Sequence, residues 1–485
     1  MKTQNRFRLA VLAGAALLAA CGGGGDDPVV VVPPTVAPEE TRAQDSRTFT
    51  PLDPAAITFA PMANQVAVTD RWAGVLNGAA YRIEVPTNWN GKLVMYAHGF
   101  RGEGATLTVS DPTIRRHLIE QGYAWAASSY STNFYDVRAG VEDTNALALA
   151  FNTIAAANGR TLPAPDRIYI TGHSMGGHVT GAAIEAEAMA TAKNKVRYHG
   201  AVPMCGVMGD AELFNRFAGM QVTAQALAGV PSYPTDKWSE IRDLVTNALF
   251  TTFNAGSIVP TAQGVKYLSV VENLTGGDRP LFDQGYQFGR SFQSAYGTFG
   301  SDGTVTGILN RNVLDTNAFT YLIDGDVPGS TALNTSAQKL TAAADANRLR
   351  RDGLRWIPAI NGEFNIPVVS IHTLGDLFVP FSMQQVYQQR ATAKGNANWL
   401  VQRAIRGASH CDFTIAEQVQ AFEDMVAWEQ GGAKPAGDDV ITPATVANPA
   451  YGCAFTNNTL GPDDTGGAAA AFRPAIAATT PACPI

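Results

Sequence analysis

The sequence carries little charge, and no long run of Lys and Arg occurs anywhere in its 485 residues. Only 16% of the residues are charged, 46% are hydrophobic, and the formal net charge is −7. A chain that binds nucleic acid usually presents clustered Lys and Arg to the phosphate backbone. We therefore expect no nucleic-acid partner. The composition is typical of a well-packed globular protein rather than a disordered one.

Cysteine is scarce, and its spacing does not suit a metal. No C-x-x-C pair occurs among the five cysteines, which are Cys21, Cys205, Cys411, Cys453 and Cys483. The sequence therefore predicts neither a metal site nor a redox dithiol, and it indicates no cofactor. The four cysteines after Cys21 suit two disulfides in an exported protein, and three pairings are open.

The apolar run near the N-terminus is too short for a permanent membrane span. Residues 9–20 are apolar, follow the basic residues Lys2, Arg6 and Arg8, and end at Cys21. The segment resembles a bacterial lipoprotein signal, in which the cysteine becomes the lipidated first residue. We expect removal of residues 1–20 and a lipid anchor on Cys21 in the bacterial cell envelope, facing the periplasm or the cell surface. The alternative is an ordinary signal peptide and a secreted protein.

Strand-like and helix-like segments alternate in two parts of the chain, which predicts an α/β fold. We expect short buried strands at 80–85, 92–97, 123–128, 167–171, 200–204, 366–372 and 399–405. We expect helices at 112–121, 141–157, 175–190, 382–391 and 414–429. Short buried strands that alternate with helices form a mostly parallel sheet with helices on both faces.

The alternation also predicts the boundaries of the segments. Residues 209–364 interrupt it with helix-like stretches such as 236–250 and 336–351, and we interpret them as a large, mainly helical insertion. The full division is a signal at 1–20, a flexible tether at 21–51, a core at 52–208, the insertion, the rest of the core at 365–432 and a disulfide-held tail at 433–485.

A Gly-His-Ser-Met-Gly-Gly motif at 172–177 joins the expected strand 167–171 to a helix. This strand–turn–helix context is that of a nucleophile elbow, G-x-S-x-G. The turn is too tight for side chains at its flanking positions, so glycines occupy them. Ser174 would lie at a helix N-terminus, whose dipole favours negative charge. The motif predicts that Ser174 is a nucleophile.

Three further motifs accompany the elbow. His98-Gly99 ends an early strand, Gly-Asp376-x-x-Val-Pro follows the strand 366–372, and Gly-x-x-His410 follows the last strand. Together with the elbow they resemble the α/β-hydrolase superfamily, over about residues 75–208 and 364–430. Residues 81–91 and 127–132 look like those of secreted bacterial hydrolases described as esterase-like or prolyl-oligopeptidase-like. The resemblance implies hydrolysis through an acyl-enzyme and leaves the substrate open.

In this superfamily the nucleophile, the acid and the histidine follow one another in that order along the chain. Of seven histidines, only His372 and His410 lie well beyond Ser174, and His372 ends a strand. The resemblance therefore implies that His410, in a loop after the last strand, is the base.

The same comparison implies the acid and the oxyanion hole. Asp376 follows the strand before the last one, and Asp324 and Asp326 are its competitors. The backbone N–H groups of Met175 and Phe100 are the expected oxyanion donors. A metal is not part of this arrangement.

Cys205 and Cys411 are both expected at the catalytic edge of the sheet. Some secreted esterases, tannases among them, support their triad with a disulfide, and the partial likeness implies a Cys205–Cys411 bond. A Cys453–Cys483 bond would then close the tail. Free buried thiols at positions 205 and 411 are the alternative.

The insertion is expected to act as a lid that forms the far wall of the substrate pocket. Its aromatic residues could bind an acyl group or pack as lid core, and they are Phe288, Phe292, Tyr296 and Phe299. The leading hypothesis is an esterase acting on carboxylic esters, possible substrates being bulky or polymeric ones. The alternatives are a serine peptidase or amidase with the same triad, and a non-catalytic surface binding module.

Overall fold

The computed structural model describes residues 48–254, 256–298, 313–344, 346–347, 349, 353–465, 467–479 and 483. The expected signal, Cys21, nearly all of the tether and Phe299 lie outside these residues. The lipid anchor therefore stays a prediction. None of the helices in the described part of the chain has both the length and the hydrophobicity that crossing a membrane requires.

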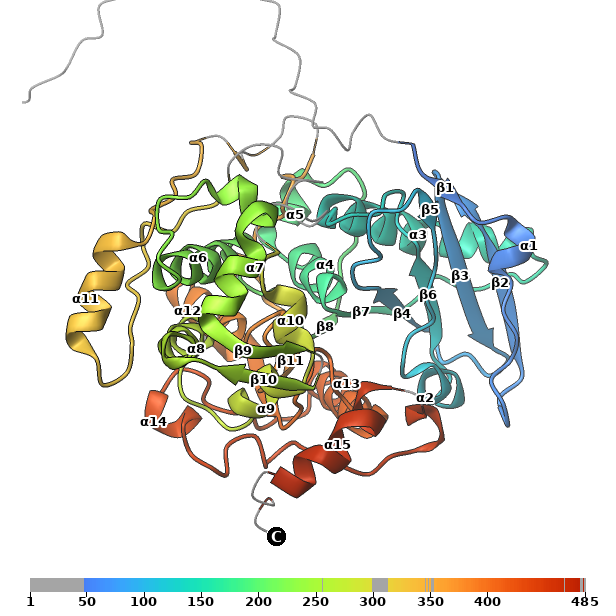
Figure 1. The fold of residues 1–485 in the computed structure, drawn as a ribbon. Coiled ribbons are helices and arrows are strands. Elements are labelled where there is room, and N and C mark those ends of the chain that lie inside the picture. The colour runs from blue at the N-terminus through green and yellow to red at the C-terminus, as the bar shows by residue number, and fades with distance from the viewer. Residues whose placement is uncertain are drawn as a thin grey trace, which may run out of the picture. The chain divides into compact units, whose positions relative to one another are not determined.

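An eight-stranded sheet forms the centre of the described chain (Figure 1). Its order is β12-β11-β8-β7-β4-β6-β3-β2, and the pairs from β12 to β6 are parallel, whereas β3 runs antiparallel to β6 and β2. The mostly parallel sheet predicted from the sequence is thus confirmed. The strands are β2 (Thr69–Leu76), β3 (Ala79–Pro86), β4 (Lys92–Ala97), β6 (Ala124–Ser128), β7 (Arg167–His173), β8 (Gly200–Met204), β11 (Val368–Thr373) and β12 (Leu400–Ile405).

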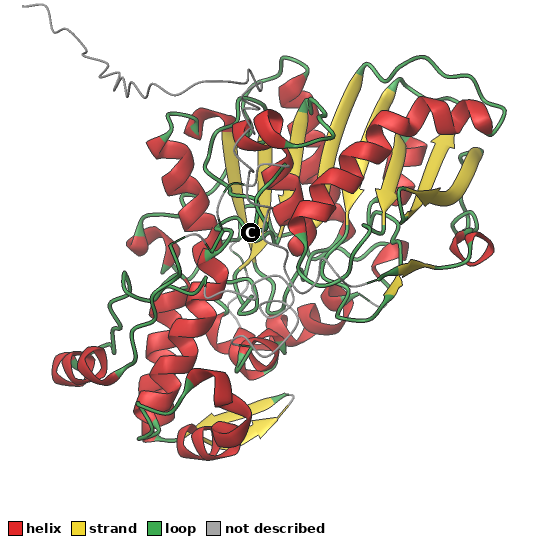
Figure 2. Cartoon of the chain, turned by 90° about the horizontal axis from the view of Figure 1, so that it is seen from above, coloured by secondary structure: helices red, strands yellow, loops and turns green. Residues whose placement is uncertain are grey.

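Helices cover both faces of this sheet, as Figure 2 shows. Side chains alternate across β4, so that Leu93 and Met95 enter one core while Val94 and Tyr96 enter the other. The first core is closed by α3 (Val137–Ala157), α4 (Met175–Ala183) and α12 (Ser382–Ala393). The second is closed by α2 (Arg115–Glu120) and α13 (Ile415–Glu429). Burial on both faces explains why β4, β6 and β8 consist almost entirely of apolar residues.

Between β8 and β11, no described residue adds a strand to the large sheet. The segment contains mostly helices and one antiparallel hairpin, β9–β10. Its elements are α6 (Glu212–Leu227), α7 (Trp238–Leu249), β9 (Phe250–Asn254), β10 (Ser257–Pro260), α8 (Ala262–Thr275), α9 (Phe282–Gln287), α10 (Ser291–Ala295) and α11 (Val327–Ser336).

The expected helix at 336–351 is wrong. The helix there is α11, which ends at Ser336, and residues 337–344 form no helix. Asp326 caps α11 by accepting from the N–H of Gly329, and a proline follows it in the first turn. After α11, tertiary hydrogen bonds hold the backbone instead, such as Leu340 N–H to Thr316 Oγ1 at 2.9 Å.

The expected helix at 175–190 is interrupted. It divides into α4 and α5 (Ala186–Thr191) at Glu185, whose backbone is extended. The buried Glu185 carboxylate accepts hydrogen bonds from the N–H groups of Gly362 and Glu363 at 2.9 Å. A contact with a distant segment thus overrides the local helical pattern.

The tail contains two helices, α14 (Pro443–Val446) and α15 (Ala468–Thr479). α15 lies beside α13 at the lower edge of Figure 1. A Cys453–Cys483 disulfide closes the segment that includes α15, as expected from the sequence.

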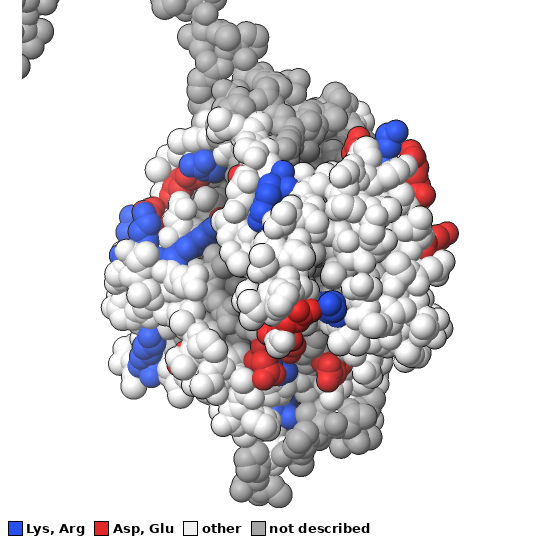
Figure 3. Space-filling view, turned by 60° about the vertical axis from the view of Figure 1, so that its left-hand side comes forward, with Lys and Arg blue, Asp and Glu red and all other residues white. Residues whose placement is uncertain are grey.

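Charged side chains are scattered among uncharged ones on the face that Figure 3 presents. Its described residues form no continuous basic strip. The absence of a nucleic-acid partner stays a prediction.

Candidate active site

Ser174 lies at the sharp turn between β7 and α4. Its backbone has a φ of 59° and a ψ of −121°, a strained conformation for a residue with a side chain. The N–H of Ser174 donates to Met204 O on the neighbouring strand at 3.0 Å. A Cβ at Gly176 would lie 2.0 Å from Ala97 O, and one at Gly172 would lie 2.4 Å from Gly176 O. The turn therefore requires the two glycines that the elbow motif supplies.

The structure brings the predicted base and acid to this serine. His410 Nε2 lies 2.8 Å from Ser174 Oγ, and His410 Nδ1 lies 2.5 Å from Asp376 Oδ2. The three side chains come from the ends of β7, β11 and β12, at one edge of the sheet. Such a chain of contacts can pass a proton from a hydroxyl to an imidazole held by a carboxylate.

Asp376 is fully buried and held by its own turn. Its Oδ1 accepts the N–H groups of Phe378 and Val379, both at 2.9 Å, which leaves Oδ2 for His410. The competing acids lie elsewhere: Asp324 accepts from Ser269, and Asp326 pairs with Lys266.

The loop after β4 passes directly over Ser174. A Cβ at Gly99 would lie 3.3 Å from Ser174 Cβ and 3.8 Å from its Oγ. Met175 is the first residue of α4 and is buried, and Phe100 follows Gly99 and is half-buried. Both predicted oxyanion donors thus belong to segments adjacent to Ser174.

The order of these groups along the sheet decides the architecture. Ser174, Asp376 and His410 follow the parallel strands β7, β11 and β12 in that order along the chain, with a strand–elbow–helix at the serine. The chain has the α/β-hydrolase fold.

Solved structures of α/β-hydrolases resemble the chain at low identity. Feruloyl esterase B from Aspergillus oryzae is 14% identical with a TM-score of 0.45, over 78% of this chain and 86% of that one. Lipase A from Candida antarctica is 15% identical with a TM-score of 0.35, over 74% and 75%. A puromycin-hydrolyzing peptidase from Mycobacterium tuberculosis is 14% identical with a TM-score of 0.36, over 78% and 42%. These values say nothing about the substrate.

The sequence comparisons are sparser. No family model matches the chain. An o-phthalyl amidase from Xanthobacter agilis is 29% identical over 89 residues, which are 18% of this chain. The match spans 20% of the length of that curated relative.

The other histidines near Ser174 have structural partners. His98 is buried, stacks on Tyr130 at 4.0 Å and lies with its Nδ1 2.6 Å from Gly99 O. Burial lowers the pKa of His98 to about 4, so the ring is neutral and its Nδ1–H can donate to that carbonyl. His98 therefore holds the loop over Ser174.

His173 and His372 are similarly occupied. Burial lowers the pKa of His173 to about 4, and its ring lies between Tyr96 Oη and Gln418 Oε1. His372 is fully buried, with its Nε2 2.7 Å from Val379 O. His372 is therefore placed to support the turn that carries Asp376, and not to reach Ser174.

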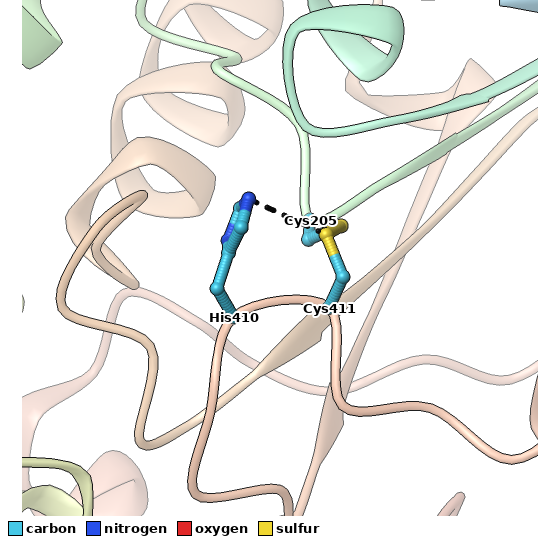
Figure 4. Close-up of side chains that lie close together, drawn as sticks. All are labelled: Cys205, His410 and Cys411. Carbon is cyan, nitrogen blue, oxygen red and sulfur yellow. Dashed lines mark hydrogen bonds between the residues drawn. A yellow bond between two sulfur atoms is a disulfide. The ribbon is translucent and has the colours of Figure 1, made fainter. Parts of the chain in front are cut away.

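The loop that carries His410, residues 406–413, is bonded to segments far away in the sequence. Figure 4 shows His410 beside the disulfide that joins Cys411 to Cys205, the bond that the resemblance implies. Ser409 Oγ donates to Gly289 O in the insertion at 2.6 Å, and Ser409 O accepts from Thr373 Oγ1 at 2.8 Å. The two sulfurs are bonded to each other, so they are not free thiolates for a metal beside His410.

The aromatic residues expected in the insertion divide into two groups, and Phe288 belongs to the first, which packs against Leu281 and Phe381. Phe292 and Tyr296 are buried against Phe250, Phe253 and Tyr267, so they form core of the insertion.

A different aromatic pair lies near His410. Phe378 is half-buried with its ring 5.5 Å from that of His410, and Phe217 of α6 packs against it at 5.8 Å. The sequence motifs did not indicate Phe217, although Phe378 lies within the acid motif.

Proposed function

We propose that this protein is an exported serine hydrolase that cleaves carboxylic esters through an acyl-enzyme. The observation that carries the proposal is the 2.8 Å approach of His410 Nε2 to Ser174 Oγ, with Asp376 behind the imidazole. Nucleophile, base and orienting acid are then in contact, which is the arrangement acyl transfer requires.

In the first half-reaction, Ser174 Oγ would attack the ester carbonyl carbon while His410 Nε2 takes the hydroxyl proton. The carbonyl electron pair moves to oxygen, and the N–H groups of Met175 and Phe100 would stabilise this oxyanion. When the tetrahedral intermediate collapses, the bond to the leaving oxygen breaks. His410 then gives its proton to that oxygen, which departs as the alcohol.

In the second half-reaction, water would attack the acyl-enzyme while His410 takes one of its protons. The bond between the acyl carbon and Ser174 Oγ breaks, and the proton returns to Oγ. Asp376 keeps the imidazole in the tautomer that accepts at Nε2 and stabilises its charged form. The product acid leaves, and the triad is restored.

An anchor on Cys21 would place the enzyme outside the cytoplasm, where bulky or polymeric esters that cannot enter the cell are accessible. The two disulfides support an exported protein. Replacing Cys21 with Ser tests the anchor: we expect the variant to leave the membrane fraction and to lose metabolic palmitate labelling. A wild-type protein free of lipid would contradict the anchor without touching the triad.

Amide hydrolysis is the second candidate, and the 89-residue match to the o-phthalyl amidase favours it. The same triad could expel an amine instead of an alcohol. A non-catalytic surface module is the remaining alternative, and it has no use for a base in contact with the serine.

Turnover on matched substrates separates these functions. We would compare purified wild type and Ser174→Ala on p-nitrophenyl esters and p-nitroanilides of the same acyl group. We expect ester cleavage that is faster than amide cleavage and lost with Ser174. Faster amide cleavage would replace the ester assignment, and an absence of Ser174-dependent fluorophosphonate labelling would exclude both enzymes.

A further inference from the structure

We propose that Arg473, in the C-terminal helix α15, is a positioning residue that sets the loop carrying His410. The inference rests on the proposed function, because it concerns how the base reaches Ser174. It adds the tail of the chain to the parts of the molecule on which the reaction depends.

Arg473 is buried and points under the base loop. Its Nη2 donates to Asp412 O at 2.7 Å, only two residues after His410. The same guanidinium donates to both carboxylate oxygens of Glu417, at 2.9 and 3.1 Å, and to Asn458 Oδ1 at 2.8 Å. One side chain therefore connects the base loop, the start of α13 and the tail.

The Asp412 carboxylate makes a hydrogen bond within the loop itself. It is fully buried, and its Oδ2 accepts the N–H of Ala408 at 3.0 Å, which closes the loop around His410. Its Oδ1 lies 3.6 Å from Arg473 Nε. Burial raises the pKa of Asp412, and the positive charge of Arg473 opposes this change.

Glu417 extends the same network to the helix that follows. Its carboxylate completes the capping box of α13 with Thr414, by accepting the Thr414 N–H at 2.9 Å. Burial raises the pKa of Glu417 too, and Arg473 again opposes this. Without Arg473, two buried carboxylates, Asp412 within the loop and Glu417 at the start of α13, would lack their cation, and breaking a buried pair in this way is costly.

The chemistry depends on the loop because His410 must reach two partners at once. A shift of about 1 Å in a catalytic group can cost up to about a hundredfold in rate. Loss of Arg473 should therefore lower kcat. KM should change little, because the hydrogen-bond partners of Arg473 are Asp412, Glu417 and Asn458, none of which is proposed to contact the substrate.

The experiment compares Arg473→Met with Arg473→Lys and with a matched control. The control is Arg115→Met, on α2. Arg115 is also a buried arginine, and its Nε lies 2.6 Å from the buried Glu84 carboxylate. Each protein is titrated with a fluorophosphonate so that kcat refers to folded active sites. Steady-state kinetics on a p-nitrophenyl ester and thermal melting are then measured.

We expect kcat of Arg473→Met to fall about tenfold or more with KM within about twofold of wild type. Arg473→Lys should give an intermediate kcat because it keeps the charge but loses the fork of donors. Arg115→Met should lower the melting temperature and leave kcat close to wild type.

A wild-type kcat in Arg473→Met would overturn the inference, as would an equal loss of kcat in Arg115→Met. If Arg473→Met does not fold, Arg473→Lys decides: a kcat equal to wild type overturns the proposal, and a lower kcat at unchanged KM supports it. If the wild-type protein neither turns over esters nor labels at Ser174, the proposed function fails instead.

Discussion

Ser174 and His410, the proposed nucleophile and base, are held in opposite ways. Ser174 is fixed within one continuous strand–turn–helix, and its closest supports are the two strands beside β7. His410 lies on a loop whose supports are 206 residues away at Cys205, 120 away at Gly289 and 61 away at Arg473.

Because of this difference, the positions of Ser174 and His410 depend on different parts of the molecule. The elbow depends on the sheet around it, because the atoms that constrain it belong to the neighbouring strands β4 and β8. The loop that carries His410 takes its observed position only when the insertion, the tail and the disulfide are all in place, since each contributes a bond to it. We therefore expect damage far from the site to affect the base more than the nucleophile.

Replacing Asp376 with Asn breaks the base side most directly. The amide can donate where the carboxylate accepts from His410 Nδ1, so the imidazole would adopt the wrong tautomer. We expect kcat on a p-nitrophenyl ester to fall about 10⁴-fold with little change in melting temperature. A loss below about tenfold would show that Asp376 is not the acid.

Gly176→Ala breaks the nucleophile side instead. The added methyl would lie 2.0 Å from Ala97 O, inside the sheet, so we expect unfolding to be easier by about 3 kcal/mol or more. Gly104→Ala is the matched control, because a Cβ there meets nothing within 4 Å. Chemical denaturation of both variants measures the difference, and equal stabilities would contradict the steric account of the elbow.

His98 gives the nucleophile side a sensitivity to acid. Its folded-state pKa of about 4 lies below the usual 6.5, so the unfolded chain binds more protons between these values. The free energy of unfolding should therefore be highest above pH 6.5. It should decline as the pH falls toward 4, by at most about 3 kcal/mol for His98. Denaturant titrations at several pH values should show a shallower decline in His98→Asn. Parallel curves for the two proteins would rule out this role.

Removal of the Cys205–Cys411 disulfide should affect His410 and leave Ser174 in place, with a smaller effect on kcat than the loss of Asp376. In a Cys205→Ser, Cys411→Ser double variant, the base loop loses one distant support while the elbow glycines are untouched. We expect kcat to fall about tenfold at nearly constant KM. The Cys453→Ser, Cys483→Ser pair is the control, and it should lower kcat less because Arg473 keeps its direct bonds. Equal kcat values for both pairs would remove the special role of Cys205–Cys411.

The same contrast explains what could be predicted from the sequence. β4 and β8 were predicted to the residue, and the elbow was recognised, because strand length and tight turns leave local patterns. β2 was missed although Asn77-Gly78 is a hairpin turn signal before β3. The interruption at Glu185 and the contacts of Ser409 with Gly289 depend on segments far apart, and no local pattern encodes them.

Arg473 is the plainest case of such a contact. It lies in an Ala-rich tail where the sequence indicated only a disulfide-held extension, yet it bonds to the residue two positions after His410. A single arginine has no motif, so only the fold reveals its partner.

The central claim is that Ser174 becomes acylated, and mass spectrometry of the trapped enzyme tests it most directly. The protein would be mixed with p-nitrophenyl acetate, quenched in acid within seconds and digested. We predict an added acetyl group on the peptide of the wild type that contains Ser174, and no acetyl group on the corresponding peptide of Ser174→Ala. An acetyl group located on another residue of wild type, or ester turnover that persists in Ser174→Ala, would contradict the account.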